Sequence, residues 1–505
     1  MIKTDPMLRH FYQLRQFNPA WLDHEGRIPF GSVMVHAIQQ ARFDGLDPEF
    51  YHFNQIVSIF QTIQNSTQRP DLAIEAASLD ILLTNAFFQL GRHLQRGKAA
   101  SQLKRSNGLL DAMDRHLLNG LNNSLSSGKI FSELERLKSI NQDNQALRRA
   151  LGKYIRIKEK GGWPVIPEGK TLKNGDRDNR IILLKKRLLL TGDLKFNMDA
   201  PGAKANLTPI FDAALESAIR HFQWRHGLRQ SGLYNRKTQL VLNLPVEQRL
   251  LQIRINMDQR RWLPQNLGKR HITVNIPSME LMAVFNSETV LKMRVIVGKP
   301  EHQTPVFSDT IPYLVINPYW YIPPAIVEHE ILPAMKKNPD YLAIHRIRLF
   351  EKMSADQKEV LAEMVDWQSL TPDNIGFYFR QDPGWGNSLG AFKFVVPNRQ
   401  HIYLHDTPSK NLFQRSSRAL SFGCVRLEYP AKLASFVLQD TQNWTKPKIN
   451  RLMNTGNPRK VVLSEPVPLH VAYWTVVVDQ KSRLRFLPDV YNLVPELTAA
   501  FTSME

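Results

Sequence analysis

Length, composition and charge already exclude several classes of protein. The chain has 505 residues, 43% hydrophobic and 22% charged, so it is a folded chain with room for two or three domains rather than a disordered one. Its net charge of +20 favours anionic partners. The basic residues are scattered, however, and no nucleic-acid-binding motif accompanies them, so we expect no nucleic acid among the partners.

The chain has a single cysteine, Cys424. One thiol excludes an internal disulfide framework and any zinc site that needs several thiolates. It is either a buried small hydrophobe or a reactive nucleophile, and its neighbours have to decide between the two. The sequence has no phosphate-binding loop, no Gly-x-Ser-x-Gly elbow and no His-Glu-x-x-His motif, so we expect no cofactor and no metal.

Residues 1–165 show the apolar spacing of helices. The clearest stretch begins at the helix-start signal Pro70-Asp71 and continues at three- and four-residue intervals to Leu90. Turn formers around Gly161 and Pro167 end the region. We therefore expect a helical scaffold domain that carries no catalytic residue.

A smaller helical unit is predicted over residues 166–248. Its pattern consists of two helical stretches, two glycine turns and the start of a third helix: 181–188, 211–223, Gly227, Gly232 and Thr238. This pattern resembles the peptidoglycan-binding domain family, a three-helix fold. The family usually has an aspartate before the second turn glycine, where this chain has Ser231.

The pattern then becomes that of strands, and we expect a catalytic domain over 249–480 and a C-terminal tail over 481–505. The predicted strands are 271–276, 291–297, 313–317, 392–396, 402–405, 460–463 and 472–478. Between them, residues 320–379 have helical spacing, notably over 326–336 and 356–365. An insertion this long is usually functional, and its aromatic residues favour a helical lid over a substrate cleft rather than a decoration. The whole chain is thus predicted to be an α+β multidomain protein.

The surroundings of Cys424 favour a reactive thiol. The cysteine follows Gly423 in a turn, and His405 ends an upstream strand whose alternation places Tyr403 on the same face. A thiol acts through its thiolate, and a neighbouring imidazole can lower the pKa of the thiol and carry the proton during acyl transfer. A glycine at this place lets backbone N–H groups approach a developing oxyanion.

A cysteine with an upstream histidine is a weak signal, but the full pattern is specific. A histidine that ends a strand, followed by Ser-x-Gly-Cys-Val-Arg-Leu over 421–427, resembles the signature of the L,D-transpeptidase catalytic domain, the family named after its YkuD representative. The resemblance covers about 265–466. Together with the helical scaffold and the peptidoglycan-binding unit, the chain is similar to the large YcbB-type branch found in Gram-negative bacteria.

This resemblance implies a role for each residue of the pattern. Cys424 would be the acylated nucleophile and His405 its general base. Gly423 and Cys424 would offer backbone N–H groups to the oxyanion, and Tyr403 would line the same pocket. Arg426 would either orient a substrate carboxylate or brace the loop, and both roles stay open here.

Further candidate substrate-binding residues surround this core, and they are Ser421, Phe422, Asp406, Trp320 and Tyr321. Ser421 is expected to stabilise the turn through its hydroxyl. Asp406 stands where many family members have glycine, and Phe422 stands where they often have histidine or serine. The two aromatic residues are candidates because they belong to the predicted lid.

The resemblance implies a reaction on the peptide stems of peptidoglycan. A tetrapeptide stem would acylate Cys424 with loss of D-alanine, and the amine of a second stem would resolve the thioester to cross-link two diamino acid residues. Carbapenems are expected to acylate the same thiol, and other wall-synthesis enzymes are further candidate partners. Residues 1–14 lack the apolar core of a secretion signal, so the periplasmic location that the resemblance implies requires a leader already removed.

Two other functions remain open at this point. If water resolves the thioester, the protein would be an L,D-carboxypeptidase or a hydrolase that detaches wall-linked lipoprotein. Alternatively, the chain would be a non-catalytic scaffold that binds the wall, although the presence of both His405 and Cys424 argues against that.

Overall fold

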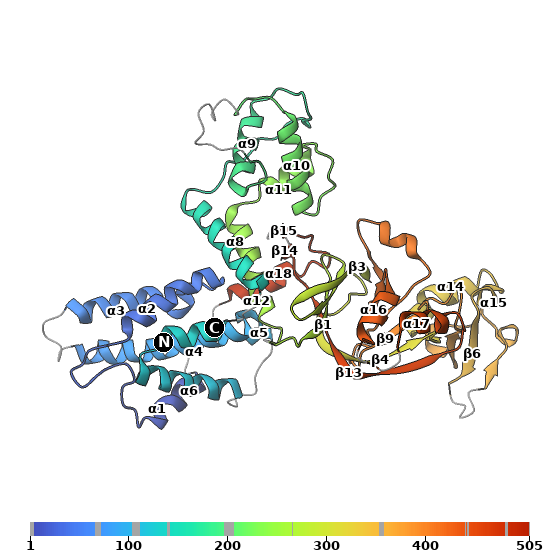
Figure 1. Ribbon diagram of the computed structural model, residues 1–505, viewed down its shortest axis with the longest axis horizontal. Coiled ribbons are helices and arrows are strands. Elements are labelled where there is room, and N and C mark those ends of the chain that lie inside the picture. Colours follow the sequence, from blue (N-terminus) through green and yellow to red (C-terminus); the bar gives the residue numbers. More distant parts are fainter. Residues whose placement is uncertain are drawn as a thin grey trace. The chain divides into compact units, whose positions relative to one another are not determined.

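The structure is a computed structural model that divides into two compact units, residues 1–265 with 474–505 and residues 266–473 (Figure 1). It describes residues 5–65, 72–103, 112–138, 142–195, 207–264, 266–352, 358–439, 441, 444–479 and 483–503. Within these residues, no helix has both the length and the apolar character needed to cross a bilayer.

The first unit begins with the helical module that the sequence predicts. Its helices are α1 (Pro6–Leu14), α2 (Gly31–Gln40), η1 (Ala41–Asp44), η2 (Pro48–Tyr51), α3 (Phe53–Asn65), α4 (Ala73–Arg96), α5 (Lys98–Leu103), α6 (Ala112–Ser127), α7 (Ile130–Arg136) and α8 (Gln142–Glu159). The predicted start signal Pro70-Asp71 lies outside the described residues. In α1, the Asp5 carboxylate accepts a hydrogen bond from Met7 N at 2.9 Å, the usual N-terminal cap.

The three-helix unit follows as α9 (Arg180–Thr191), α10 (Ala213–Arg225) and α11 (Arg236–Leu242). Its turns are held by the buried amide of Gln223, which donates to Leu233 O at 3.0 Å and to Thr238 Oγ1 at 3.0 Å and accepts from Gly232 N at 3.0 Å. Ser231 Oγ accepts from Leu233 N at 3.2 Å, so the serine closes the turn locally.

The predicted borders at 248 and 480 fall inside the first unit. Helix α12 (Val246–Arg260), strands β14 (Val476–Val478) and β15 (Leu484–Phe486), and helix α18 (Val494–Thr502) all belong to it. Leu497 and Phe501 of α18 pack in one apolar cluster with Ala99 and Ile255. The segment predicted as a tail is therefore partly packed into the fold.

The second unit is built on a nine-stranded sheet in the order β11-β3-β12-β10-β9-β4-β13-β1-β2, and an additional pairing of β2 with β3 closes it on itself. The strands are β1 (Arg270–Asn275), β2 (Glu280–Phe285), β3 (Glu288–Gly298), β4 (Phe307–Ile316), β9 (Phe392–Val395), β10 (Leu404–His405), β11 (Ala419–Ser421), β12 (Val425–Leu427) and β13 (Arg459–Ala472). The helices η8 (Lys410–Gln414), α16 (Pro430–Val437) and α17 (Lys446–Met453) complete it. The predicted β-rich domain is confirmed.

The insertion is mixed rather than helical. It comprises β5 (Trp320–Tyr321), α13 (Pro324–Ile326), the π-helix η5 (Val327–Ile331), α14 (Leu332–Met335), α15 (Tyr341–Ile344), β6 (Ile347–Glu351), β7 (Glu359–Val360), η6 (Ala362–Met364), η7 (Pro372–Asn374) and β8 (Phe377–Gln381). Its strands form a separate sheet in the order β5-β8-β6-β7 around a core of its own. In Figure 1, α14, α15 and β6 lie at the end of this unit farther from β1.

The helix expected over 356–365 is wrong for the residues that the structure describes. Val360 pairs with Leu349 across β6 and β7, and only a short 3₁₀ turn follows. The apolar spacing suited a helix, but cross-strand packing on β6 decided the conformation. The expectation over 326–336 is largely confirmed, with a π-helical turn in the middle.

Candidate active site

The single cysteine lies in a tight turn between β11 and β12, and its side chain is half-buried. Gly423 has a φ of 107°, a conformation that only glycine adopts readily. Ser421 Oγ donates to Cys424 O at 2.6 Å and accepts from Gly423 N at 3.2 Å. Ser421 thus closes the turn, the task that the sequence suggested for it.

A second segment, after β3, supports this turn from behind, and no motif in the sequence pointed to it. Buried Thr304 donates its hydroxyl to Gly423 O at 2.6 Å and accepts from Gly298 N at 2.9 Å. The Phe422 ring packs against His302 at 4.7 Å between centroids, and Lys299 Nζ lies 4.2 Å from the centre of the same ring. The only sequence feature that marked this segment was Gly298, the last residue of β3.

His405 is buried at the end of β10, with 5% of its surface exposed. Its Nδ1 lies 2.6 Å from the backbone carbonyl of Asp406, so Nδ1 carries the proton and Nε2 keeps a free lone pair. The Tyr403 ring lies beside it, with the ring centroids 5.6 Å apart. The carbonyl therefore orients the imidazole although Asp406 replaces the usual glycine.

The Asp406 carboxylate is occupied by the protein itself. It accepts from Ala391 N at 2.9 Å, from Thr407 N at 2.7 Å and from Lys410 Nζ at 2.6 Å. These bonds fix the backbone that holds His405. A direct contact of Asp406 with substrate stays a prediction, and its three donors favour a positioning role.

Strand register gathers the site on one face of the sheet. His405 pairs with Arg426 of β12 on one side and with Lys393 of β9 on the other. Cross-strand partners point to the same face, so the three side chains form a row. Cys424 lies two residues before Arg426 and Tyr403 two residues before His405, which places both toward this row.

Burial sets the protonation of the Cys424 thiol and the His405 imidazole. It lowers the pKa of His405 to about 3, and the positive charges of Arg426 and Lys393 act in the same direction. Burial also raises the pKa of the Cys424 thiol, although hydrogen bonds from Tyr403 and the charge of Lys393 act against it. At neutral pH the site therefore holds a neutral thiol and a neutral imidazole. The thiolate expected from the sequence therefore does not form before substrate binds. Cys424 Sγ lies 4.0 Å from His401 O.

One of the two predicted backbone donors already has a partner. Gly423 N–H is already directed at Ser421 Oγ. Within the part of the chain that the structure describes, Cys424 N–H has no backbone or side-chain acceptor. Cys424 N–H is thus the donor left for an oxyanion.

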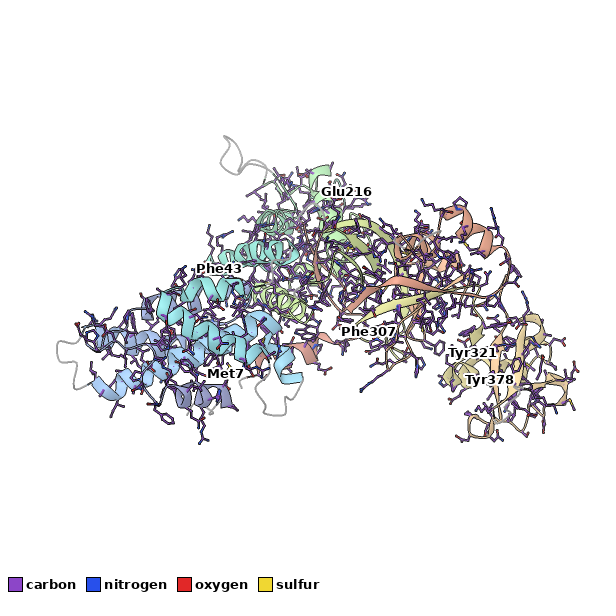
Figure 2. All side chains as sticks on the ribbon, turned by 60° about the horizontal axis from the view of Figure 1, so that its bottom comes forward. Met7, Phe43, Glu216, Phe307, Tyr321 and Tyr378 are labelled. Atoms are coloured by element: carbon purple, nitrogen blue, oxygen red, sulfur yellow. The ribbon has the colours of Figure 1, made fainter. Side chains whose placement is uncertain are left out.

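The two lid aromatics point in different directions. Trp320 of β5 reaches the site, where its side chain acts on the Tyr403 hydroxyl and partly offsets the burial that raises the pKa of this phenol. Tyr321, its neighbour in the strand, is 56% exposed and lies 5.9 Å from Tyr378 between ring centroids (Figure 2). Successive strand residues face opposite sides, so the structure brings Trp320 to the site and turns Tyr321 away from it.

Arg426 is half-buried with its Nε unpaired among the described residues, and it interacts electrostatically with Glu330 of the π-helix and with Cys424. In those residues its guanidinium donates no hydrogen bond to the loop. A bracing role would require such bonds, so the arrangement favours the other role, contact with a substrate anion.

No group of three histidine, cysteine, aspartate or glutamate side chains in the described residues could hold a metal ion.

Comparison with known families agrees with these domains. Residues 269–461 match the L,D-transpeptidase catalytic domain, named YkuD. Residues 6–151 match the model described as "Scaffold domain", and residues 177–242 match the "Putative peptidoglycan binding domain".

Among curated proteins, a "Putative L,D-transpeptidase" of Haemophilus influenzae is 32% identical over 229 residues, which is 45% of this chain and 45% of that protein. The chain thus matches slightly less than half the length of that relative. An L,D-transpeptidase from Mycobacterium smegmatis is 12% identical, with a TM-score of 0.21 and coverage of 40% of this chain and 58% of that chain. An L,D-transpeptidase from Xylanimonas cellulosilytica is 13% identical, with a TM-score of 0.18 and coverage of 60% and 98%.

The assignment rests on the matched domains and on the geometry around Cys424, not on those weak superpositions. A β-rich domain presents a cysteine turn, a carbonyl-oriented histidine and a row of cations on one sheet face. It does so in a chain that also carries a scaffold domain and a peptidoglycan-binding domain. The catalytic domain of this chain, residues 269–461, belongs to the L,D-transpeptidase (YkuD) family.

Proposed function

We propose that this protein is an L,D-transpeptidase that joins diamino acid residues of two peptidoglycan stems through a thioester on Cys424 and releases D-alanine. The observation that carries the proposal is the neutral His405 imidazole, whose Nδ1–H is held by Asp406 O and whose Nε2 is left to accept a proton on the strand face that His405 shares with Arg426, two residues beyond Cys424. A base of this kind is needed because the thiol is not ionised beforehand.

Acylation follows from this arrangement. His405 Nε2 takes the thiol proton while Sγ bonds to the carbonyl carbon of the diamino acid residue, and the carbonyl electron pair moves to the oxygen. Cys424 N–H, together with the Tyr403 hydroxyl, stabilises that oxyanion. When the carbon–nitrogen bond breaks, His405 gives the proton to the departing amine of D-alanine, and the thioester remains.

Deacylation uses the same groups in the reverse order. The amine of a second stem attacks the thioester carbonyl, and His405 takes the amine proton. The carbon–sulfur bond then breaks, and the sulfur recovers the proton from His405. The product is an amide bond between two diamino acid residues.

The test uses the full chain with purified disaccharide tetrapeptide, and the products are identified by mass spectrometry. A cross-linked dimer with loss of D-alanine supports transpeptidation. Monomeric tripeptide would instead indicate an L,D-carboxypeptidase, and tripeptide released from lipoprotein-linked stems a detaching hydrolase. Products that are unchanged in Cys424→Ala would refute the thiol chemistry, and the absence of any product would leave a wall-binding scaffold.

We further propose that the three-helix unit docks the enzyme to the wall, that carbapenems acylate Cys424, and that the protein acts in the periplasm. Its match to a peptidoglycan-binding family supports the first point, and the location follows from where such a substrate is assembled. Deletion of residues 170–244 should reduce co-sedimentation with sacculi. Equal sedimentation of the two forms would count against docking.

A further inference from the structure

Lys393 lies in the active site although no sequence motif points to it. On β9, its register partners are His405 on one side and Val315 of β4 on the other. The next strand beyond His405 contributes Arg426. The neutral base is thus flanked by two cations on the same sheet face.

The Lys393 ammonium lies against an aromatic ring and has no counter-ion among the described residues. Its Nζ lies 4.0 Å from the centre of the Tyr403 ring, and the side chain is half-buried. Among the residues that the structure describes, it takes part in no ion pair and no hydrogen bond. Burial lowers its pKa, and the proximity of Cys424 is the one interaction that raises it.

The two cations therefore differ in what they can offer a ligand. Arg426 interacts with the carboxylate of Glu330, whereas no carboxylate in the described part of the chain acts on Lys393. Partial burial of a cation without a counter-ion is unfavourable. An anion that enters beside Cys424 would remove that penalty.

We propose that Lys393 binds the terminal carboxylate of the donor peptide, on the D-amino acid that leaves, and so selects stems that end one residue beyond the attacked carbonyl. This rests on the transpeptidase function proposed above. In such a donor the carboxylate is one carbon away from the nitrogen of the bond that breaks, so it must lie close to Cys424. A stem that continues or ends in an amide has no charge at that place.

The experiment compares two donors on the full chain: a tetrapeptide stem with free terminal D-alanine and the same stem with terminal D-alaninamide. The second-order rate of thioester formation is followed by intact-mass spectrometry. Wild type should prefer the carboxylate by about 10- to 100-fold, the range for one hydrogen bond between charged groups. Lys393→Met should reduce that preference to about threefold or less, and Lys393→Arg should restore part of it.

Lys460→Met is the matched control, because Lys460 Nζ lies 4.1 Å from the centre of the Tyr313 ring on β4, an equivalent lysine–tyrosine pair at an exposed position. This variant should keep the wild-type preference. Alkylation of Cys424 by neutral iodoacetamide shows how far the loss of positive charge alone alters the thiol, since that reagent has no carboxylate.

Equal rates for the two donors in wild type, with a thioester formed from both, would overturn the role of Lys393 and leave the proposed function standing. An equal slowing of both donors in Lys393→Met, with the preference kept, would also overturn it. If wild type forms no thioester with either donor, the proposed function itself fails, and this inference with it. If Lys393→Met does not fold, Lys393→Gln takes its place with the same two donors.

Discussion

The depressed pKa of His405 predicts a specific dependence of stability on pH. The imidazole has a pKa of about 3 in the folded protein, because it is buried and flanked by cations, against about 6.5 in an unfolded chain. Between these values the unfolded state binds the proton and the folded state does not. The contribution of His405 to stability is therefore complete above about pH 6.5, falls as the pH drops toward 3, and is constant below that.

The magnitude follows from the difference in pKa. At pH 4 the unfolded imidazole is fully protonated and the folded one is almost entirely neutral, so the free energy of unfolding is roughly 3 kcal/mol lower than at pH 8 from this residue alone. His405→Asn removes the titrating ring and retains an N–H that can donate to Asp406 O. The stability difference between wild type and variant should change by that amount between pH 8 and pH 4.

The assay must report on the catalytic unit by itself. The full chain is unfolded in urea at each pH and given a pulse of hydrogen–deuterium exchange. Mass analysis of peptides from β9 and β13 then reports the unfolding of the catalytic unit alone. Carboxylates and the other histidines titrate equally in both proteins and cancel in the difference. A difference that stays constant with pH would refute the burial argument, as would an NMR titration of His405 centred near pH 6.5.

Three further substitutions test how the site is held. Thr304→Val leaves Gly423 O and Gly298 N without their partner, so urea unfolding should show a free energy of unfolding lower by about 1–3 kcal/mol. Thr304→Ser keeps the hydroxyl and should stay close to wild type. Equal losses in the two variants would contradict this role of Thr304. Gly423→Ala forces a φ of 107° on a residue with a Cβ, so the free energy of unfolding should fall by about 1–3 kcal/mol and thioester formation should become slower. An unchanged rate would show that the turn is not strained there. Trp320→Phe removes the indole N–H that acts on the Tyr403 hydroxyl and should slow thioester formation by up to about 10-fold with little change in melting temperature. A full loss of folding would instead make Trp320 structural.

Much of the fold follows from local patterns in the sequence. Apolar spacing of three and four residues identified the N-terminal helices, and β-branched runs bounded by turn residues identified β1, β3, β4, β9 and β13. The insertion was the exception, because Val360 sits in a pattern that suits a helix as well as a strand. Only its pairing with Leu349, eleven positions earlier, decides the matter.

The site was predictable where it is local in sequence. The turn from Ser421 to Cys424 and the placement of His405 at a strand end were both accessible to pattern reasoning. Thr304 and Lys393 were not, because their proximity to the thiol arises from strand register between distant segments. The neutral state of the thiol also depends on burial, which the sequence around Cys424 does not reveal.

The most direct test of the proposed chemistry is to capture the acyl-enzyme. Full-length wild type is mixed briefly with a tetrapeptide stem, quenched in acid, and its mass and peptide map are measured before and after treatment with neutral hydroxylamine. We predict a mass increase equal to the stem without its terminal D-alanine, located on the peptide that contains Cys424 and removed by hydroxylamine, and no increase in Cys424→Ala. An adduct on another residue, or the same adduct in Cys424→Ala, would contradict the account.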